Sequence, residues 1–472
     1  MFFNSIEYFL FFPIVFFLYW IIGGKNIKYQ NLLLLIASYF FYGWWSLNFL
    51  TILILSTIID FSLAFAINKN NRLKAKLYLC LSISINIGIL AFFKYYNFFI
   101  EEIQTQFLNL GITSNLSVLK IVIPVGISFY TFHGISYIFD VYRRKIEPIK
   151  NIVDYSIFVS FFPLLVAGPI ERATHLLPQI QKNRKFNYTQ AVEGCYLIIW
   201  GLFKKMIIAD NLAFYVNNTF ETYQNFTALS LIFAAIAFSF QIYCDFSGYS
   251  DIALGSAKLL GFELLSNFKF PYFSKNMMDF WRRWHISLSS WFRDYLYIPL
   301  GGSRGTKLQT IRNISVVFIL SGFWHGANWT FIFWGILHAM FYILFISLEK
   351  KIIIPDYYPK LKSLIQMIIT FVFITITWIF FRSTSIRDAF FFLRSILANI
   401  YQNPKALFNG EGLTNMEVFW YIIPFVIIDW SIRHDERKIN SFIFKKIIYF
   451  LIFSIIIKLI SLNNPAFIYF QF

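Results

Sequence analysis

Residues 30–67 read QNLLLLIASYFFYGWWSLNFLTILILSTIIDFSLAFAI, and Asp60 is the only charged residue among them. A helix that crosses a bilayer requires about 20 mostly apolar residues, and this stretch is roughly twice that long. It therefore predicts two consecutive transmembrane helices, at 30–46 and 48–67.

The composition of the whole chain agrees with this local pattern. Of 472 residues, 58% are hydrophobic and 22% aromatic, and only 14% are charged, against about 25% in soluble globular proteins. A soluble fold of this length would expose large apolar patches, whereas a bilayer accepts them. No Gly/Ser-rich or Pro-rich linker divides the chain. We expect one membrane-embedded domain over residues 1–472.

Apolar segments of spanning length recur along the chain, at 8–22, 30–46, 48–67, 77–99, 120–141, 190–209, 226–244, 311–326, 328–348, 364–381, 416–431 and 447–463. We therefore predict an all-α, polytopic membrane protein with about 11–13 transmembrane helices. Segment 152–168 is also apolar but ends in Ala167-Gly168-Pro169, which indicates a re-entrant or broken helix buried in protein.

The net charge of +17 is distributed in a way that argues against a nucleic-acid partner. Lys and Arg gather between apolar runs, notably at 69–76, 143–150 and 433–438. Such clusters are typical of cytoplasmic loops under the positive-inside rule. A nucleic-acid binder would need a soluble module with a basic face, and the sequence contains none. Some of these cations could instead serve anionic headgroups or an anionic cofactor.

The three cysteines, Cys80, Cys195 and Cys244, form no CxxC pair and lie near no histidine with zinc-ligand spacing. We expect no metal cofactor, and we predict that all three are small buried side chains in apolar surroundings. The N-terminus lacks a basic region and a cleavage site, so its first apolar run is expected to be a retained span.

Residues 276–293 differ in character from the spans. Their tryptophans recur at helical spacing, and three polar residues follow one another by three and four positions: Arg282, His285 and Ser289. This pattern predicts one amphipathic helix at the membrane interface with those three residues on a common face. The tryptophans would also be explained if this helix only anchored the protein at the membrane interface and had no catalytic role.

His325 is the foremost catalytic candidate. It lies in Ser-Gly-Phe-Trp-His-Gly-Ala-Asn-Trp, residues 321–329, between two apolar stretches. Polar groups inside a bilayer are costly, so an intramembrane histidine is a functional hypothesis by default. Gly322 and Gly326 would allow close approach of another backbone or of a substrate, and Trp324 and Trp329 could exclude water. The alternative is that the imidazole only bonds to a neighbouring helix.

Two other groups of polar residues are weaker candidates. His285 is the second candidate because it would share a face with Arg282, whereas His338 on an apolar helix is expected to be a satisfied core residue. Asp245 and Asp251 are expected to be structural, paired with Arg282 or Arg283, because buried carboxylates usually have a partner.

Motifs of rival chemistries are missing from the sequence. It contains no P-loop, no dinucleotide-binding fingerprint and no HExxH. Histidine-assisted acyl transfer therefore has few competitors within the chain.

Five runs in this order resemble the membrane-bound O-acyltransferase family, and within it the bacterial branch of alginate and peptidoglycan O-acetylation proteins. They are residues 161–172, 241–251, 279–289, 291–302 and 321–329. Together they span a core of about residues 120–345. Cys244 stands where an aromatic residue would be expected, a small departure.

The resemblance implies helices around two opposed funnels that meet near a catalytic histidine. That histidine matches His325, and the second family histidine matches His285. Acetyl-CoA on the cytoplasmic side is the implied donor, and the implied acceptor is a separate extracytoplasmic partner similar to SGNH hydrolases. The location would be the bacterial cytoplasmic (inner) membrane. The aromatic tail 464–472 resembles one whose tyrosine, here Tyr469, is proposed to carry the acyl group. Such an aromatic tail could equally be an anchor at the membrane interface.

The expected mechanism has His325 accepting the proton of an attacking hydroxyl, that of Tyr469 or of the partner's nucleophile. Arg282, Arg283 and Arg304 would hold the donor phosphates, since guanidinium matches phosphate geometry. His285 would orient the donor. Two alternatives stay open, D-alanyl transfer to teichoic acid from a carrier protein and a non-catalytic acyl-group transporter. The polysaccharide is not specified by these residues.

Overall fold

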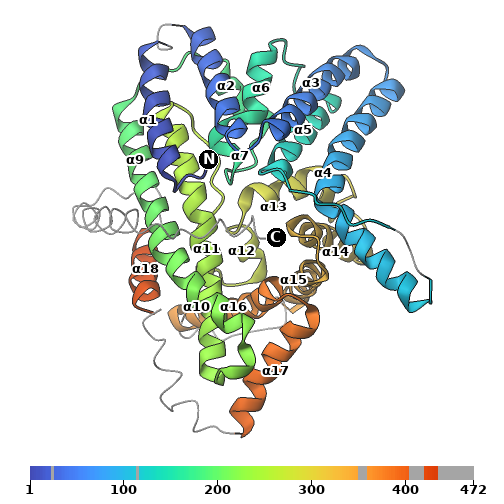
Figure 1. The fold of residues 1–472 in the computed structure, drawn as a ribbon, viewed down its shortest axis with the longest axis vertical. Coiled ribbons are helices and arrows are strands. Elements are labelled where there is room, and N and C mark those ends of the chain that lie inside the picture. Colours follow the sequence, from blue (N-terminus) through green and yellow to red (C-terminus); the bar gives the residue numbers. More distant parts are fainter. Residues whose placement is uncertain (23–25, 113–115, 349–358, 403–418, 434–472) are drawn as a thin grey trace. The chain divides into compact units, whose positions relative to one another are not determined.

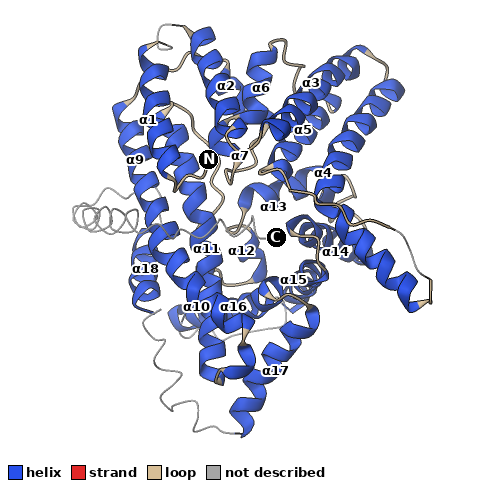
Figure 2. Cartoon of the chain, viewed as in Figure 1, coloured by secondary structure: helices blue, strands red, loops and turns tan. Residues whose placement is uncertain are grey.

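A computed structural model describes residues 1–22, 26–112, 116–348, 359–402 and 419–433. Every regular element in these ranges is a helix (Figure 2). The helices of the first half are α1 Ile6–Ile21, α2 Ile27–Gly43, α3 Leu47–Lys69, α4 Arg72–Asn109, α5 Ile127–Tyr142, α6 Ile152–Ser160, α7 Phe162–Leu165, α8 Ala173–Ile180 and α9 Tyr188–Leu202. Those of the second half are η2 Phe203–Ala209, α10 Asp210–Glu221, η3 Tyr223–Asn225, α11 Ala228–Leu259, η4 Pro271–Phe273, α12 Met277–Trp281, α13 Ile286–Phe292, η5 Arg293–Tyr297, α14 Lys307–His325, α15 Trp329–Leu348, α16 Pro359–Arg382, α17 Ile386–Gln402 and α18 Phe419–Ile432. The predicted all-α class is confirmed.

Within the described ranges, five helices are long and apolar enough to cross a membrane: α3, α4, α11, α15 and α16. Shorter apolar helices lie at Ile6–Ile21, Ile152–Leu165 and Phe419–Ile432. The predicted span at 447–463 and the tail at 464–472 lie outside the described residues. The chain is a polytopic helical membrane protein, and the number of about 11–13 spans stays a prediction.

Two predicted helices have different limits in the structure. The span expected at 120–141 begins only at Ile127, because Pro124 cannot continue a helical hydrogen-bond ladder and Gly126 adopts a left-handed conformation with φ of 73°. The span expected at 226–244 instead continues to Leu259. Asp245 and Asp251 therefore lie within α11 and not at its end.

The broken helix predicted at 152–168 is confirmed. α6 ends at Ser160, α7 is a single turn, and the backbone is not helical through Gly168-Pro169. Residues 154–171 are buried throughout. Non-helical backbone in a membrane protein is tolerated where protein surrounds it, which is the case here.

The chain divides into two compact units. The first comprises residues 1–198 and 252–265, and its elements can be followed by label and sequence colour in Figure 1. In this unit α3, α4 and α5 pack against one another, and Phe162 of α7 lies among the rings of Phe11, Phe12 and Phe41.

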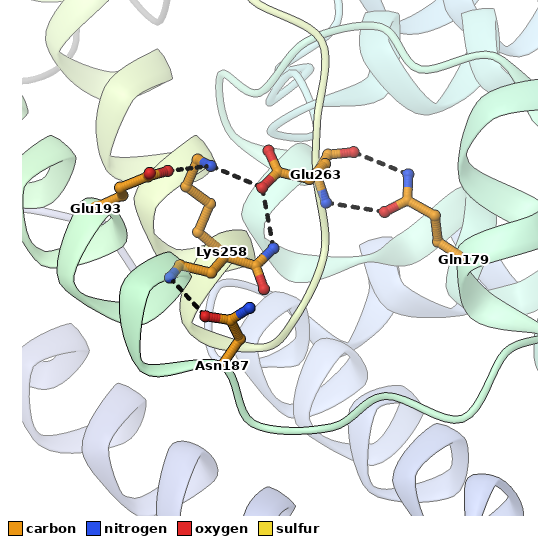
Figure 3. Close-up of polar contacts among 6 residues, drawn as sticks. Gln179, Asn187, Glu193, Lys258 and Glu263 are labelled. Carbon is orange, nitrogen blue, oxygen red and sulfur yellow. Dashed lines mark hydrogen bonds and ion pairs between the residues drawn. The ribbon is translucent and has the colours of Figure 1, made fainter. Parts of the chain in front are cut away.

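A polar network in the first unit joins α8, α9 and the end of α11 (Figure 3). The buried Lys258 ammonium donates to Glu193 at 3.0 Å and to Glu263 at 2.7 Å. Gln179 exchanges two hydrogen bonds, of 2.8 and 2.9 Å, with the backbone of Glu263. A buried cation is retained where carboxylates neutralise it, as Glu193 and Glu263 do for Lys258.

The second unit comprises residues 199–251 and 266–472, of which those up to 433 are described in part. α14, α15 and α16 pack in sequence order. Their interface is aromatic, with Trp334 and Trp378 stacked at 5.7 Å between ring centroids. This aromatic core surrounds the candidate site.

The prediction that all three cysteines are buried is wrong for two of them. Cys244 is buried, but Cys80 and Cys195 are exposed. In a membrane chain the apolar surroundings of a residue include lipid, so a small apolar side chain need not be covered by protein.

Candidate active site

His325 is the last residue of α14, and the turn that follows holds it in place. A Cβ atom at Gly322 would collide with the backbone carbonyl of Phe331, and one at Gly326 with the Phe331 ring. Only glycine at these two positions lets α14 and α15 meet so closely. The close backbone approach predicted for Gly322 is confirmed.

The His325 ring is buried, with 3% of the residue exposed, in an aromatic enclosure. Its centroid lies 5.0 Å from the Trp324 ring, 5.1 Å from Trp334 on α15 and 5.4 Å from Phe381 on α16. The expectation that Trp324 shields the imidazole agrees with this packing. Trp329 is half exposed and does not belong to the enclosure.

The single amphipathic helix predicted at 276–293 is wrong. α12 ends at Trp281, and α13 begins at Ile286, because His285 has a left-handed backbone with φ of 41° and ψ of 54°. A left-handed residue interrupts the helical ladder, so Arg282, His285 and Ser289 do not share a helical face. Arg282 is exposed while His285 is buried.

Asn267 holds the two residues that follow His285. Its carbonyl accepts from the Ile286 N–H at 2.9 Å, and its side-chain oxygen accepts from Ser287 at 2.6 Å. Its amide nitrogen donates to Ser250 on α11 at 3.2 Å. A bulky residue at positive φ is unfavourable, and it persists only where contacts with the surrounding structure outweigh that cost. Such residues are found often at functional sites.

The His285 imidazole lies edge-on to Phe246 of α11, with centroids 4.7 Å apart. Only 1% of the residue is exposed, and neither ring nitrogen has a hydrogen-bond partner among the described residues. Burial lowers the pKa of His285 to about 3, since an apolar environment disfavours the charged ring. The neutral imidazole can therefore accept a hydrogen bond from a bound molecule.

Trp324 connects the two predicted histidines. Its ring lies 5.9 Å from His285 and 5.0 Å from His325, centroid to centroid. The structure thus brings together two residues that are 40 positions apart. The third predicted catalytic residue, Tyr469, lies outside the described residues.

The three arginines predicted to bind phosphate differ in exposure and in whether the guanidinium group already has a partner. Arg282 and Arg304 are exposed. Arg283 is partly buried and donates from Nε to Asp279 at 2.7 Å. Its guanidinium is therefore already committed to a carboxylate one helical turn away.

The structure corrects the partners predicted for the α11 carboxylates. Asp245 pairs with Lys205 at 2.5 Å and Asp251 with Lys204 at 2.7 Å, so neither pairs with Arg282 or Arg283. Lys205 also contacts Asp210 at 2.7 Å. Asp245 and Asp251 therefore form buried ion pairs, as expected, but their partners are lysines and not arginines.

Both lysines lie on η2, a π-helical turn, and neither is among the residues predicted above. Lys204 and Lys205 are 4% and 1% exposed. Two adjacent cations inside the apolar run 190–209 were a signal for a buried ion-pair cluster, because charges in such runs require partners. π-turns occur frequently at functional sites.

The remaining described histidines have structural partners. His338 contacts the Thr377 hydroxyl through Nε2 at 3.0 Å, as expected of a core residue. His133 Nε2 accepts from the Glu171 N–H at 3.0 Å, and His175 Nδ1 lies 2.7 Å from Glu171 Oε2. Across the described ranges, no group of three or more His, Cys, Asp or Glu could hold a metal ion.

The sequence model of the membrane-bound O-acyltransferase family matches residues 40–386. The chain belongs to this family. It is therefore a membrane-bound O-acyltransferase, and the match contains both predicted site histidines, His285 and His325, and all three candidate arginines. Tyr469 lies beyond the matched range.

This O-acyltransferase is similar to proteins named for polysaccharide O-acetylation. It is 40% identical over 388 residues to the probable alginate O-acetylase AlgI of Pseudomonas syringae pv. tomato, covering 82% of this chain and 73% of that protein. It is 36% identical over 427 residues to the corresponding protein of Pseudomonas aeruginosa, covering 90% and 80%. It is 35% identical over 419 residues to the peptidoglycan O-acetyltransferase of Helicobacter pylori, covering 82% and 78%.

Proposed function

We propose that this O-acyltransferase takes an acetyl group from cytoplasmic acetyl-CoA for O-acetylation of a cell-envelope polysaccharide in the bacterial inner membrane. The names of its relatives support both the acetyl group and the polymer class. The observation that carries the proposal is His325, an imidazole buried at the end of α14 within the family match.

In the proposed reaction, His325 accepts the proton of an attacking hydroxyl as its oxygen adds to the thioester carbonyl. Collapse of the adduct breaks the C–S bond, and the imidazolium returns its proton to the departing thiolate, which leaves as the free thiol of CoA. A positioned general base typically contributes about 10²–10⁴-fold to the rate. The aromatic rings around His325 support this role because they exclude water that would otherwise hydrolyse the thioester.

The exposed Arg282 and Arg304 are proposed to bind the phosphates of the donor, because guanidinium groups match phosphate geometry. Arg283 contributes mainly through its ion pair with Asp279, which orders the segment leading to His285. His285 is proposed to orient the donor thioester by accepting a hydrogen bond or by packing beside it.

The attacking hydroxyl is proposed to be that of Tyr469 or of a nucleophile on an extracytoplasmic SGNH-hydrolase-like partner. In the first case the tyrosyl ester is an intermediate, and the partner completes transfer to the sugar. The choice of polymer would then belong to the partner.

The decisive experiment compares His325→Gln with the wild type in a strain that lacks the native gene. We expect polymer O-acetyl content and acetyl-CoA turnover by membranes to fall at least about 100-fold in the variant, because the general base is lost. Membrane levels of the protein should be unchanged. His338→Gln is the matched control, since it alters another buried histidine of the same aromatic core and should retain activity.

Four outcomes discriminate between the proposals. Normal acetylation by His325→Gln would refute the catalytic assignment. An equal loss of activity in His325→Gln and His338→Gln would mean that both histidines only maintain the packing of the aromatic core. In the same assay, Tyr469→Phe tests whether Tyr469 carries the acyl group or only anchors the tail at the membrane interface. Full activity of this variant would rule out the acyl-carrier role. Labelled D-alanine entering the polymer from a carrier protein, in place of labelled acetyl, would favour the D-alanyl alternative.

A further inference from the structure

The left-handed turn at His285 is held on both sides by the loop between α11 and η4. Before the turn, the Lys269 N–H donates to the carbonyl of Arg283 at 2.9 Å. After the turn, the carbonyl of Asn267 accepts from the Ile286 N–H, also at 2.9 Å. Two backbone hydrogen bonds to one loop therefore fix the chain that enters and leaves His285.

The side chain of Asn267 extends this hold to α11. Its oxygen accepts from the Ser287 hydroxyl at 2.6 Å, and its amide nitrogen donates to Ser250 at 3.2 Å. Asn267 and Ser287 are 1% exposed and Ser250 is 2% exposed. An amide carries an acceptor and a donor on one short side chain, so Asn267 links the start of α13 to α11. Because the link is buried, water cannot replace a lost hydrogen bond there.

The same part of α11 supplies the ring against which His285 packs. Phe246 lies four residues before Ser250 and therefore on the same face of the helix. Its ring centroid is 4.7 Å from that of His285. Phe268 packs against both sides of the turn, 5.0 Å from Phe246 and 5.1 Å from Trp284. A change in the hydrogen bonds of this loop would therefore shift His285 against its aromatic neighbours.

The turn decides where the imidazole lies. In one continuous helix, His285 would follow Arg282 by three residues and share its face. Arg282 is exposed, whereas His285 is buried. The left-handed conformation is unfavourable for a histidine, with φ of 41°. The hydrogen bonds of the loop thus maintain a conformation that buries the imidazole instead of exposing it.

We propose that Asn267 is a positioning residue for the acyl donor. Its amide fixes the His285 turn on α11 and so sets the direction in which the imidazole meets the donor thioester. The inference rests on the proposed role of His285 in orienting that thioester. Asn267 acts through His285 and takes no chemical part in the transfer.

The test is a double-mutant cycle on donor binding. The full-length protein carries His325→Gln, so that bound acetyl-CoA is not consumed, and the Kd is measured by calorimetry in detergent. We expect Asn267→Ala and His285→Gln each to raise the Kd of acetyl-CoA about five-fold, the usual value of one hydrogen bond. Together they should still raise it about five-fold and not about 25-fold, because both changes remove the same contact.

A second ligand separates positioning from a general loss of structure. Free CoA lacks the acetyl thioester, so its Kd should change less than about two-fold in Asn267→Ala and in His285→Gln. A protein whose donor site is disordered would bind both ligands more weakly.

A milder variant protects the test against misfolding. Ser250→Ala removes only the acceptor of the Asn267 amide and should raise the Kd of acetyl-CoA about two- to five-fold. Ser239→Ala is the matched control, since it removes another buried hydroxyl of α11, one that lies 3.1 Å from the Thr375 hydroxyl. The Kd of acetyl-CoA should be unchanged in this control.

Each contrary result overturns the inference. Effects that multiply in the double variant would make Asn267 a structural residue that acts independently of His285. An unchanged Kd in Asn267→Ala, an equal loss for free CoA, or an equal loss in Ser239→Ala would do the same. An unchanged Kd in His285→Gln would remove the donor role of His285 and this inference with it, while the assignment of His325 is tested separately by polymer acetylation. A protein that binds no acetyl-CoA at all would contradict the donor in the proposed function itself.

Discussion

Residue by residue, the histidines of this enzyme differ in the chemistry of the groups around them. His285 lies among aromatic side chains, including Phe246 and Trp324. Its imidazole stays neutral, because burial lowers its pKa to about 3. His175 is more exposed and lies against the carboxylate of Glu171, which raises its pKa. Environment and not residue type therefore decides which histidine carries charge at neutral pH.

The His175–Glu171 contact predicts a pH-dependent stability. Because the pKa of His175 is higher in the folded state than unfolded, its contribution is fully present below the unfolded value of about 6.5 and is lost as the pH rises through the raised folded value. His175 is 38% exposed on its side chain, so solvent screening limits the effect to less than about 1 kcal/mol. The Tm of the wild type should fall from pH 6 to pH 8, and that of His175→Gln should fall less.

The comparison is made in one detergent across a buffer series of constant ionic strength. Substitution of the exposed Lys182, which keeps the Glu171 contact, is the control and should leave the wild-type pH slope intact. A slope in His175→Gln equal to that of the wild type would assign the pH dependence to other groups.

At the scale of elements, close helix contacts position the site. η2 widens the helix so that Lys204 and Lys205 both reach carboxylates of α11. Breaking such a buried ion pair by removing one partner typically costs about 3–5 kcal/mol. Gly248 permits this approach, since a Cβ atom there would press on the Gly201 carbonyl.

The α14–α15 contact makes a second prediction. Gly322→Ala should force α14 away from the Phe331 carbonyl, at a cost of about 1–3 kcal/mol, and displace His325 at the end of the helix. We expect a lower Tm and an acetylation rate reduced by at least about ten-fold, because small misplacements of catalytic groups are costly.

Gly88→Ala is the matched control for this substitution. It makes the same change within α4, where a Cβ atom would meet nothing within 4 Å, and the gain in helix propensity is worth up to about 1 kcal/mol. Its Tm and activity should equal or exceed those of the wild type. Full activity of Gly322→Ala would show that the close contact between α14 and α15 does not position His325.

For the molecule as a whole, the distribution of charge predicts its orientation. The basic loops 69–76 and 143–150 are expected on the cytoplasmic side, which is also where acetyl-CoA occurs. Sealed inside-out membrane vesicles should therefore release CoA from labelled acetyl-CoA, while sealed right-side-out vesicles should not.

Detergent-opened vesicles of both kinds provide the control and should react equally. The His325→Gln protein in inside-out vesicles gives the background, which should be lower by at least about 100-fold. Equal turnover by sealed vesicles of either orientation would contradict the predicted topology of the donor site.

Much of this protein could be predicted from local sequence. The runs of about 20 apolar residues determine an all-helical membrane protein, because a backbone in lipid must satisfy its own hydrogen bonds. Ala167-Gly168-Pro169 predicts the helix break, and the isolation of His325 among apolar residues marks it as the candidate base. These inferences need only composition, spacing and the cost of burying polar groups.

Only the tertiary structure decided how the polar residues are paired. Periodicity predicted one helix through His285, but that residue is left-handed, and Asn267 bonds to the two residues that follow it. Likewise the partners of Asp245 and Asp251 proved to be lysines on a π-helical turn. Such choices depend on atoms brought together from distant parts of the chain, and helical periodicity reports only which residues share a face within one element.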